Sequence, residues 1–285
     1  MASAAIYKFS IGSLGCTALL DGFEEVTPAQ DLFENAAPDE LTAALSRYGT
    51  TAAGTYTATC TCLLITVEQH TVLVDTGLGR LAPTSGHLME ALREAGAEPR
   101  DVGLVILSHG HGDHIAGITQ TDGSLAFPNA QWIIDREEWE FWLESPHPPS
   151  VPAFFGEIAE RELQPIADRV TLVDCAKEIM PGVSVVPLHG HTPGHMAVAV
   201  RSGGQELLYV GDAMLHPLQV EHPEWCAGTW ADMDWEQVVL SRRRIYDRAV
   251  AEDALVLAYH FHPFPSLGHI RRSGKTWQWD AIVTE

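Results

Sequence analysis

Four potential metal ligands crowd into six residues of this 285-residue chain, His109-Gly110-His111-Gly112-Asp113-His114. The apolar run Leu104–Ser108 comes directly before them and predicts a short buried strand that ends at the cluster. His109 and His111 stand two positions apart, so an extended backbone turns both imidazoles to the same side. The apolar residues that follow predict a helix start, where the carboxylate of Asp113 is favoured. The fold must therefore bring a strand end and a helix N-terminus together around a polar site.

This cluster has the chemistry of a metal site with room for two ions. His109 and His111 can hold one divalent ion, while Asp113 and His114 reach a second one nearby. Mixed histidine and carboxylate ligation suits Zn²⁺ and also accepts Mn, Fe or Co. Further ligands are expected from distant segments, and three positions at predicted strand ends offer them: His191 within Gly190–His195, Asp212 after strand 206–210, and His260 after strand 255–258.

Strand-like and helix-like segments alternate along the whole chain, and no low-complexity linker divides it. Helices are predicted over 40–48, 87–95, 135–143 and 234–249. Strands are predicted over 6–11, 16–20, 57–67, 71–75, 104–108, 131–134, 183–187, 196–200, 206–210 and 255–258, with Asp21-Gly22 as a turn. This pattern predicts one α/β domain over residues 1–285, built from two sheets with outer helices. Lid-like excursions are expected near 144–165 and 213–233.

The charge of the chain limits its partners. Seventeen Lys and Arg residues against thirty-eight Asp and Glu residues give a formal net charge of −21. Such a chain repels nucleic acid and anionic membrane surfaces, so neither is expected as a partner. No stretch approaches the roughly 20 apolar residues of a membrane span, and residues 1–22 show no secretory signal. A cytoplasmic protein is expected, and the basic run Arg242-Arg243-Arg244 is predicted to form salt bridges from a helix.

Together these motifs resemble those of the metallo-β-lactamase-fold superfamily, and the resemblance extends from Asp75-Thr76-Gly77 to His260 and beyond. It implies an α/β fold of the four-layer αββα type, in which two mixed sheets are flanked by outer helices. It also implies a hydroxide that bridges two metals as the nucleophile, with Asp113 as an acceptor for its proton. The implied ligands of the first metal are His109, His111 and His191; those of the second are Asp113, His114 and His260, with Asp212 bridging.

The stretch from Asp212 to Trp225 looks like the branch that contains methyl parathion hydrolase and related lactonases. That branch implies a small neutral ester-type substrate: a lactone, a carboxylic ester or a phosphotriester. Acyl-homoserine lactonases often place a tyrosine shortly after the bridging aspartate, where this chain has Met214, Leu215 and His216. His216 is therefore the candidate for a catalytic role in place of the tyrosine.

Two other functions stay open at this point. A glyoxalase-II-like thioesterase would use late basic residues to bind glutathione, and Arg271, Arg272 and Lys275 could serve. A non-hydrolytic metal-binding protein or one-metal oxidoreductase of the same fold is the alternative from a different class, although the full second ligand set argues against it.

Residues around the site are assigned by their position next to the motifs. Asp75, His195 and His262 are expected to support the ligands, and His262 also competes with His260 as the last ligand. An apolar pocket wall or a homodimer contact is as plausible as simple packing for four aromatic residues: Phe154, Phe155, Trp225 and Trp230.

Overall fold

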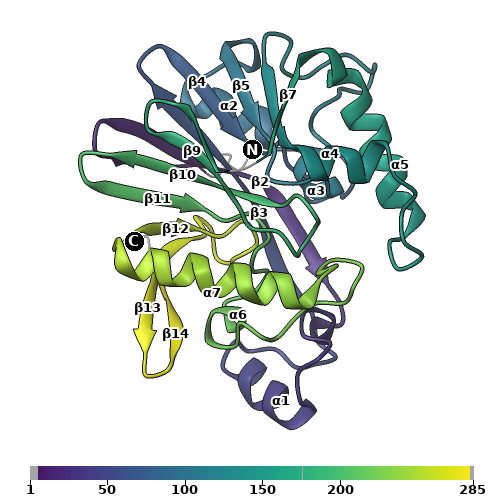
Figure 1. The fold of residues 1–285 in the computed structure, drawn as a ribbon, viewed down its shortest axis with the longest axis vertical. Helices are drawn as coiled ribbons and strands as arrows, with labels where there is room; N and C mark the ends of the chain where they lie inside the picture. Colours follow the sequence, from purple (N-terminus) through teal and green to yellow (C-terminus); the bar gives the residue numbers. More distant parts are fainter. Residues whose placement is uncertain (1–5, 175, 283–285) are drawn as a thin grey trace.

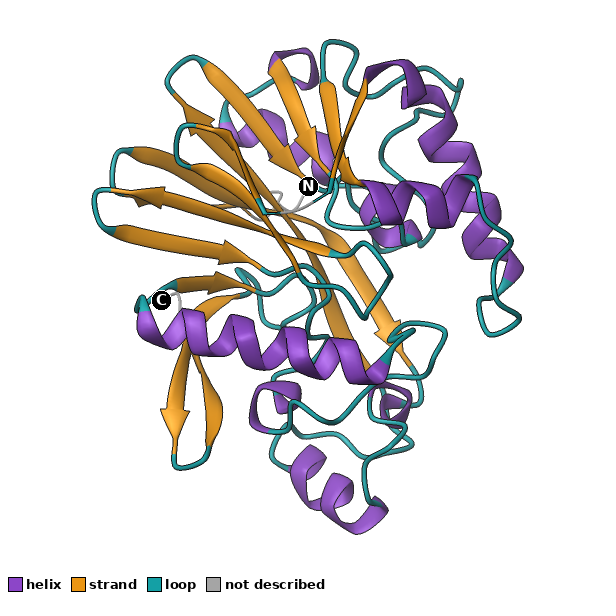
Figure 2. Cartoon of the chain, viewed as in Figure 1, coloured by secondary structure: helices purple, strands orange, loops and turns teal. Residues whose placement is uncertain are grey.

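The structure is a computed structural model that describes residues 6–174 and 176–282. The described residues form two seven-stranded sheets that face each other, as Figures 1 and 2 show. The first sheet contains, in spatial order, β1 (Ile6–Ile11), β2 (Leu14–Val26), β3 (Tyr56–Val67), β4 (His70–Val74), β5 (Val102–Ile106), β6 (Gln131–Asp135) and β7 (Val170–Val173). Strands β1 to β4 pair with one another antiparallel, and the pairs from β4 to β7 are parallel.

The second sheet is also mixed. Its strands, in spatial order, are β14 (Thr276–Ala281), β13 (Leu267–Ser273), β12 (Leu255–Leu257), β11 (Gln205–Tyr209), β10 (Met196–Ser202), β9 (Val183–Pro187) and β8 (Lys177–Met180). Only β11 and β12 are parallel. Parallel neighbours end at the same edge, so the segments after β11 and β12 leave the sheet side by side.

Helices cover the outer faces of both sheets (Figure 2). The helices against the first sheet are α2 (Leu88–Ala95) and α4 (Arg136–Leu143), and α7 (Trp235–Ala251) lies against the second. Shorter or peripheral helices are α1 (Pro38–Ser46), α3 (Gly112–Ile115), α5 (Ala153–Leu163), α6 (Leu218–Glu221) and the 3-10 turns η1 (Ala29–Leu32), η2 (Pro99–Asp101) and η3 (Gln164–Arg169). None of the described helices is long and apolar enough to cross a membrane.

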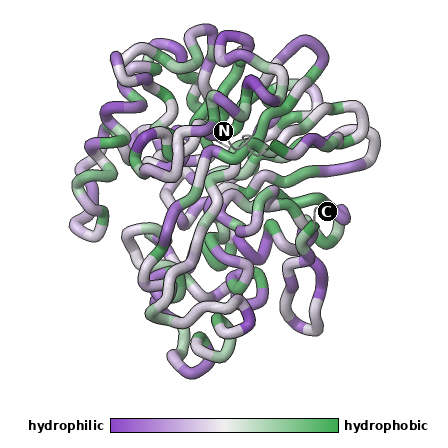
Figure 3. The backbone as a smooth tube through the Cα atoms, turned by 180° about the vertical axis from the view of Figure 1, so that it is seen from behind, coloured by the Kyte–Doolittle hydropathy of each residue, from purple (hydrophilic) through white to green (hydrophobic). Residues whose placement is uncertain are grey.

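Strand periodicity explains why the layers stack in this order. In β10, Val198 and Val200 belong to the apolar core between the two sheets, whereas Ala197 and Ala199 pack beneath α7 with Tyr246. Successive strand residues point to opposite faces, so a strand that is apolar at every position must be covered on both sides. Figure 3 shows the same result for the chain as a whole, since the apolar segments follow the central strands and the polar ones the outer turns. The predicted four-layer α/β sandwich is confirmed.

Strand β2 corrects one sequence-based prediction. Asp21-Gly22 is not a turn, because β2 continues to Val26 through an irregularity in its pairing with β3 between Leu20 and Gly22. The Asp21 carboxylate is buried and accepts hydrogen bonds from the backbone N–H groups of Leu78 and Leu88. Gly22 lies so close to the backbone of Thr84 that a Cβ would collide with its carbonyl oxygen. Long-range contacts therefore replace the turn that the dipeptide favours.

The excursions also differ from their predicted form. The segment 144–165 contains α5, which the proline-rich composition of its first half concealed. The hairpin β13–β14 and the strands β7 and β8 do not follow from the sequence, since β7 and β8 have only four residues each and the hairpin carries many polar residues. Segments 144–165 and 213–233 both contribute side chains to the cavity described below. Their ability to open and close as lids stays a prediction.

Candidate metal centre

The His109–His114 segment connects the end of β5 to the short helix α3. His111 is the residue before α3 and has an extended backbone, with φ −69° and ψ 149°. This conformation follows the prediction that the motif leaves a strand and enters a helix. Asp113 and His114 then lie in the first turn of α3, and their side chains belong to a second group of potential metal ligands.

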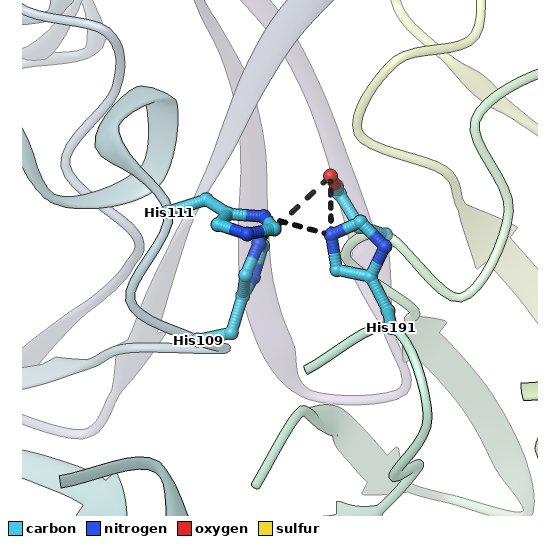
Figure 4. A group of neighbouring side chains, drawn as sticks. His109, His111 and His191 are labelled. Atoms are coloured by element: carbon cyan, nitrogen blue, oxygen red, sulfur yellow. Dashed lines mark hydrogen bonds and ion pairs between the residues drawn. The ribbon is translucent and has the colours of Figure 1, made fainter. Parts of the chain in front are cut away.

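The first cluster consists of His109, His111, His191 and Asp212, all of which are buried. Nδ1 of His111 lies 2.9 Å from Nε2 of His191, and that Nε2 lies 3.4 Å from Oδ2 of Asp212. Nε2 of His109 is 3.9 Å from the same oxygen. Figure 4 shows the three imidazoles directed at one another. Four donor atoms from three separate loops thus meet around one point.

The second cluster consists of Asp113, His114, Asp212 and His260. Nε2 of His114 lies 3.0 Å from Oδ1 of Asp212 and 3.2 Å from Oδ2 of Asp113. Nε2 of His260 lies 3.2 Å from Oδ2 of Asp113 and 3.2 Å from Oδ2 of Asp212. Asp212 belongs to both clusters, so its two oxygens join them.

These separations fit divalent metal ions. Ligand nitrogens about 2.0 Å from a tetrahedral zinc lie about 3.3 Å from one another. The contacts in both clusters are close to that value, and within each cluster all donor atoms lie within 4.8 Å of one another. The buried Nε2 of His109 makes no hydrogen bond to any residue that the structure describes. A buried nitrogen without a hydrogen-bond partner is unfavourable, and a bound metal ion would supply the missing partner.

The ionisation of the ligands differs between the clusters. Burial lowers the pKa of His111 to about 3, and the pKa of His109 also falls well below its usual value through burial and the nearby His114. Burial opposes the charged form of His260 too, but Asp212 and Asp113 raise its pKa to about 10. The pKa of His114 rises for the same reason. In the metal-free protein His109 and His111 are therefore neutral imidazoles, whereas the second cluster holds imidazolium groups paired with carboxylates.

Asp75 supports His114 from behind, as the sequence suggested. Its Oδ2 lies 2.7 Å from Nδ1 of His114 and also accepts hydrogen bonds from the hydroxyls of Ser108 and Tyr209. His195 holds the bridging residue instead, because its Nε2 accepts a hydrogen bond from the backbone N–H of Asp212. These contacts fix the orientation of the ligands, which sets the metal geometry.

Glu138 connects the two ligand loops, and sequence reasoning missed it. This buried residue of α4 accepts hydrogen bonds from the backbone N–H groups of Gly110 and Gly194, at 2.7 and 2.9 Å. The Thr192 hydroxyl and the Trp142 indole donate to the same carboxylate. Gly110 and Gly194 lie in the segments that carry His109, His111 and His191. One carboxylate thus sets the distance between them.

Asp232 was also missed. It lies 3.1 Å from Nδ1 of His191, and its other oxygen lies 2.8 Å from the guanidinium of Arg242. Burial alone would raise the pKa of Asp232, but Arg242 and His191 lower it below its usual value. The predicted salt bridges of the basic run are therefore of two kinds: Arg242 is fully buried against Asp232, whereas Arg243 pairs with Glu224 at the surface.

A cavity opens directly over both clusters. Its wall includes Phe155 and Trp230, two of the four aromatic residues considered for a pocket wall. Phe154 and Trp225 are not among the lining residues. The Phe154 side chain is largely exposed, and Trp225 stacks on His222 with 3.8 Å between ring centroids. Two of the four predicted aromatic positions therefore face the cavity.

His216 and His262 lie outside both clusters and are not among the residues lining this cavity. The His216 ring packs among Phe33, Tyr48 and Tyr56, and burial lowers its pKa to about 3. A ring enclosed in this way does not face the cavity, so the structure lends the predicted catalytic role of His216 no support, and that role stays a prediction. Of the two histidines that compete for the last ligand position, His260 lies in a cluster that could hold a metal ion and His262 does not.

Glu24 lines the cavity and was not predicted. The supposed turn at Asp21-Gly22 hid it, since a chain that turns there would not carry residue 24 towards the clusters. Burial raises the pKa of Glu24 to about 7, and the neighbouring Asp113 carboxylate adds to the increase.

Comparison with known proteins agrees with this geometry. Residues 56–260 match the metallo-beta-lactamase superfamily. The chain is 26% identical over 221 residues to an N-acyl homoserine lactonase of Bacillus sp, a match that covers 70% of this chain and 80% of the relative. The solved structure of AidC, a dizinc quorum-quenching lactonase in complex with its product, has a TM-score of 0.91 at 24% identity and full coverage of both chains. The hydrolase AbOPH has a TM-score of 0.89 at 26% identity, again over both whole chains.

The ligand clusters and these relatives agree on a binuclear-metal hydrolase with two divalent ions. The family match covers every proposed ligand from His109 to His260. The chain belongs to the metallo-beta-lactamase superfamily.

Proposed function

We propose that this protein is a dizinc hydrolase of small neutral esters, with lactones as its principal substrates. The sharing of Asp212 between two four-residue clusters carries the proposal, because such a bridge suits two ions that act on one substrate bond. The predicted ligands are His109, His111 and His191 for the first ion and Asp113, His114 and His260 for the second, with Asp212 between them. Zinc is favoured because the imidazole and carboxylate donors suit it and because the structural neighbour AidC is described as a dizinc lactonase.

Two divalent ions bound there would supply an activated water at neutral pH and polarise an acyl carbonyl. The residues of the chain do the rest. The second cluster contains two carboxylates, and the side chain of Asp113 is 14% exposed against 4% for Asp212. Asp113 is therefore the better placed of the two to accept a proton beside the substrate. Phe155, Leu215 and Trp230 form an apolar wall that excludes bulk water and accommodates an acyl chain.

The lining of the cavity also favours a neutral substrate over a glutathione thioester. No described lining residue is a lysine or an arginine. Arg271 and Arg272, which could have bound glutathione, lie on β13 and pair with Asp253 and Asp247 instead. Lactones are placed first because the Bacillus relative is named as a lactonase. Phosphotriesters come second, because they are also small neutral esters and both classes fit an apolar cavity.

Metal analysis and a substrate panel test the proposal. The protein as purified with zinc should contain about two equivalents, lose activity on chelation and regain it on zinc addition. The panel contains a long-chain N-acyl homoserine lactone, an aryl ester, methyl parathion, a β-lactam and a glutathione thioester. Highest kcat/KM on the lactone is expected. One bound iron with oxygen consumption, or thioester cleavage as the dominant activity, would overturn the proposal.

A further inference from the structure

Glu24 differs in its chemistry from the other residues of the cavity wall. Apart from the proposed metal ligands, it is the only described lining residue with a side-chain hydrogen-bond acceptor. The others are apolar or, in the case of the Trp230 indole, can only donate: Val26, Leu32, Ala58, Phe155, Leu215, Trp230 and Ala231. A carboxylate on an otherwise apolar wall therefore decides which polar group of a substrate can lie there.

Strand pairing fixes the direction of this side chain. Glu24 pairs with Ala58 of β3, and both residues line the cavity. The next residue, Glu25, is exposed and accepts a hydrogen bond from the hydroxyl of Thr57. Neighbouring residues of a strand face opposite sides of the sheet. Glu24 therefore lines the cavity, whereas Glu25 lies outside it and can serve as a control for substitutions at position 24.

The Glu24 carboxylate makes no hydrogen bond or ion pair with another residue in the described part of the chain, although the side chain is only partly exposed. A partly desolvated carboxylate without a partner is unfavourable, and a donor group on a ligand would relieve that cost. A second anion in the same cavity would add repulsion at short range. Divalent ions in the two clusters would favour the ionised form of Glu24 and so strengthen both effects.

We propose that Glu24 determines substrate specificity by accepting a hydrogen bond from an N–H group next to the scissile ester and by rejecting anionic substrates. The inference rests on the proposed ester hydrolysis and narrows it to substrates that carry an amide. It gives a function to the one acceptor side chain of the described cavity wall that is not a proposed metal ligand.

Two lactones, one with an amide and one without, test whether Glu24 accepts a hydrogen bond from the substrate. N-decanoyl homoserine lactone carries the N–H, and a γ-lactone with a matched alkyl chain does not. Glu24→Leu removes the acceptor and should lower kcat/KM for the amide lactone about 10- to 100-fold more than for the γ-lactone, mainly through KM. Glu24→Gln keeps an acceptor oxygen and should restore most of that loss. Glu25→Leu is the matched control on the same strand and should leave the ratio of the two kcat/KM values unchanged.

Aryl esters test whether Glu24 rejects anionic substrates. Wild-type enzyme should prefer 4-nitrophenyl butyrate to the anionic 4-nitrophenyl succinate monoester. Both Glu24 variants should reduce that preference about tenfold, because each removes the negative charge. Preference and amide discrimination that stay the same in both variants would overturn the inference while leaving ester hydrolysis in place.

A binding measurement separates the inference from the proposed function. N-decanoyl cyclopentylamide carries the amide but no lactone, so it binds without being cleaved. Calorimetry should show at least tenfold weaker binding to zinc-loaded Glu24→Leu than to wild type or Glu25→Leu. Failure of the wild type to hydrolyse any ester would refute the proposed function, whereas equal binding of this amide by all three proteins would refute the role of Glu24.

Discussion

The Oδ2 atom of Asp75 lies 2.7 Å from Nδ1 of His114, and Asp75 holds this contact from a left-handed backbone conformation with φ 60°. Few residues other than glycine adopt such a φ, although aspartate and asparagine tolerate it best. The carboxylate also accepts hydrogen bonds from the backbone and hydroxyl of Ser108 at 2.7 Å each. The turn after β4 is therefore shaped to deliver a carboxylate to the back of a metal ligand.

Asp75→Asn should weaken metal binding without unfolding the protein. Asparagine tolerates the left-handed conformation, but its amide cannot accept all of these hydrogen bonds or hold the same tautomer of His114. Changes of this kind typically reduce metal affinity about 10- to 100-fold. Competition with a chromophoric chelator measures the loss. Asp253→Asn is a matched control, since Asp253 has φ 48° but lies at the surface; an equal loss in that variant would contradict the role given to Asp75.

Glu138→Gln should destabilise the loops that carry the ligands. The wild-type carboxylate accepts four hydrogen bonds and donates none. A glutamine amide turns an N–H₂ group towards at least one of these donors, and an unsatisfied buried donor costs about 1–3 kcal/mol. Urea unfolding of the metal-free protein measures the change in free energy. Glu137→Gln, one residue earlier on the exposed side of α4, should change it much less.

The sequence was sufficient to select the residues that the structure brings together in the two clusters, because several of them are marked by local context. His109, His111, Asp212 and His260 follow apolar strands, and a polar residue at such a position requires an explanation that packing does not give. Residues that support the site lack such a mark. Glu138 is one of several acidic residues in α4, and only the contact with Gly110 and Gly194 distinguishes it from its neighbours.

The fold was predicted to a similar extent. Strands β1, β9 and β10 begin at the predicted residues, because an apolar run between turn residues marks them clearly. The extent of β2 depends instead on Asp21, whose carboxylate is bound by residues 78 and 88, far away in the sequence. Glu24 was therefore invisible to local reasoning. The surroundings of His216 were hidden for the same reason, since the aromatic side chains that enclose it come from residues 33–56.

Zinc binding should release protons at neutral pH. The pKa of His260 is raised to about 10 and that of His114 also lies well above its usual value, so both imidazoles are protonated in the metal-free protein at pH 7. Metal ligation requires the neutral form, so filling the second cluster should release about two protons, and its apparent affinity should rise with pH between 7 and 9. Calorimetric titration in two buffers of different ionisation enthalpy measures the release. Proton-neutral binding in both buffers at pH 7 would contradict the assignment.

Arg242→Met should be the most damaging change outside the ligand set. The guanidinium is fully buried, pairs with Asp232 at 2.8 Å and donates to the carbonyl oxygens of Ala213 and Trp225. Removing one partner of a buried ion pair leaves the other uncompensated and costs about 3–5 kcal/mol. Because Asp232 also bonds His191, the variant should lose metal affinity as well as stability. Chemical unfolding of the metal-free protein gives the first quantity and chelator competition the second.

Arg243→Met is the matched control for this change. Its guanidinium is about half exposed and lies 3.6 Å from Glu224, a surface pair of the kind that contributes about 0–1 kcal/mol. If Arg242 acts through Asp232, the double variant Asp232→Asn with Arg242→Met should recover part of the stability lost in Arg242→Met alone, since no charge is then left unpaired in the interior. It should not recover the metal affinity, because an asparagine amide does not hold His191 as the carboxylate does. Recovery of both quantities, or of neither, would contradict a coupling that runs from Arg242 through Asp232 to the metal ligand.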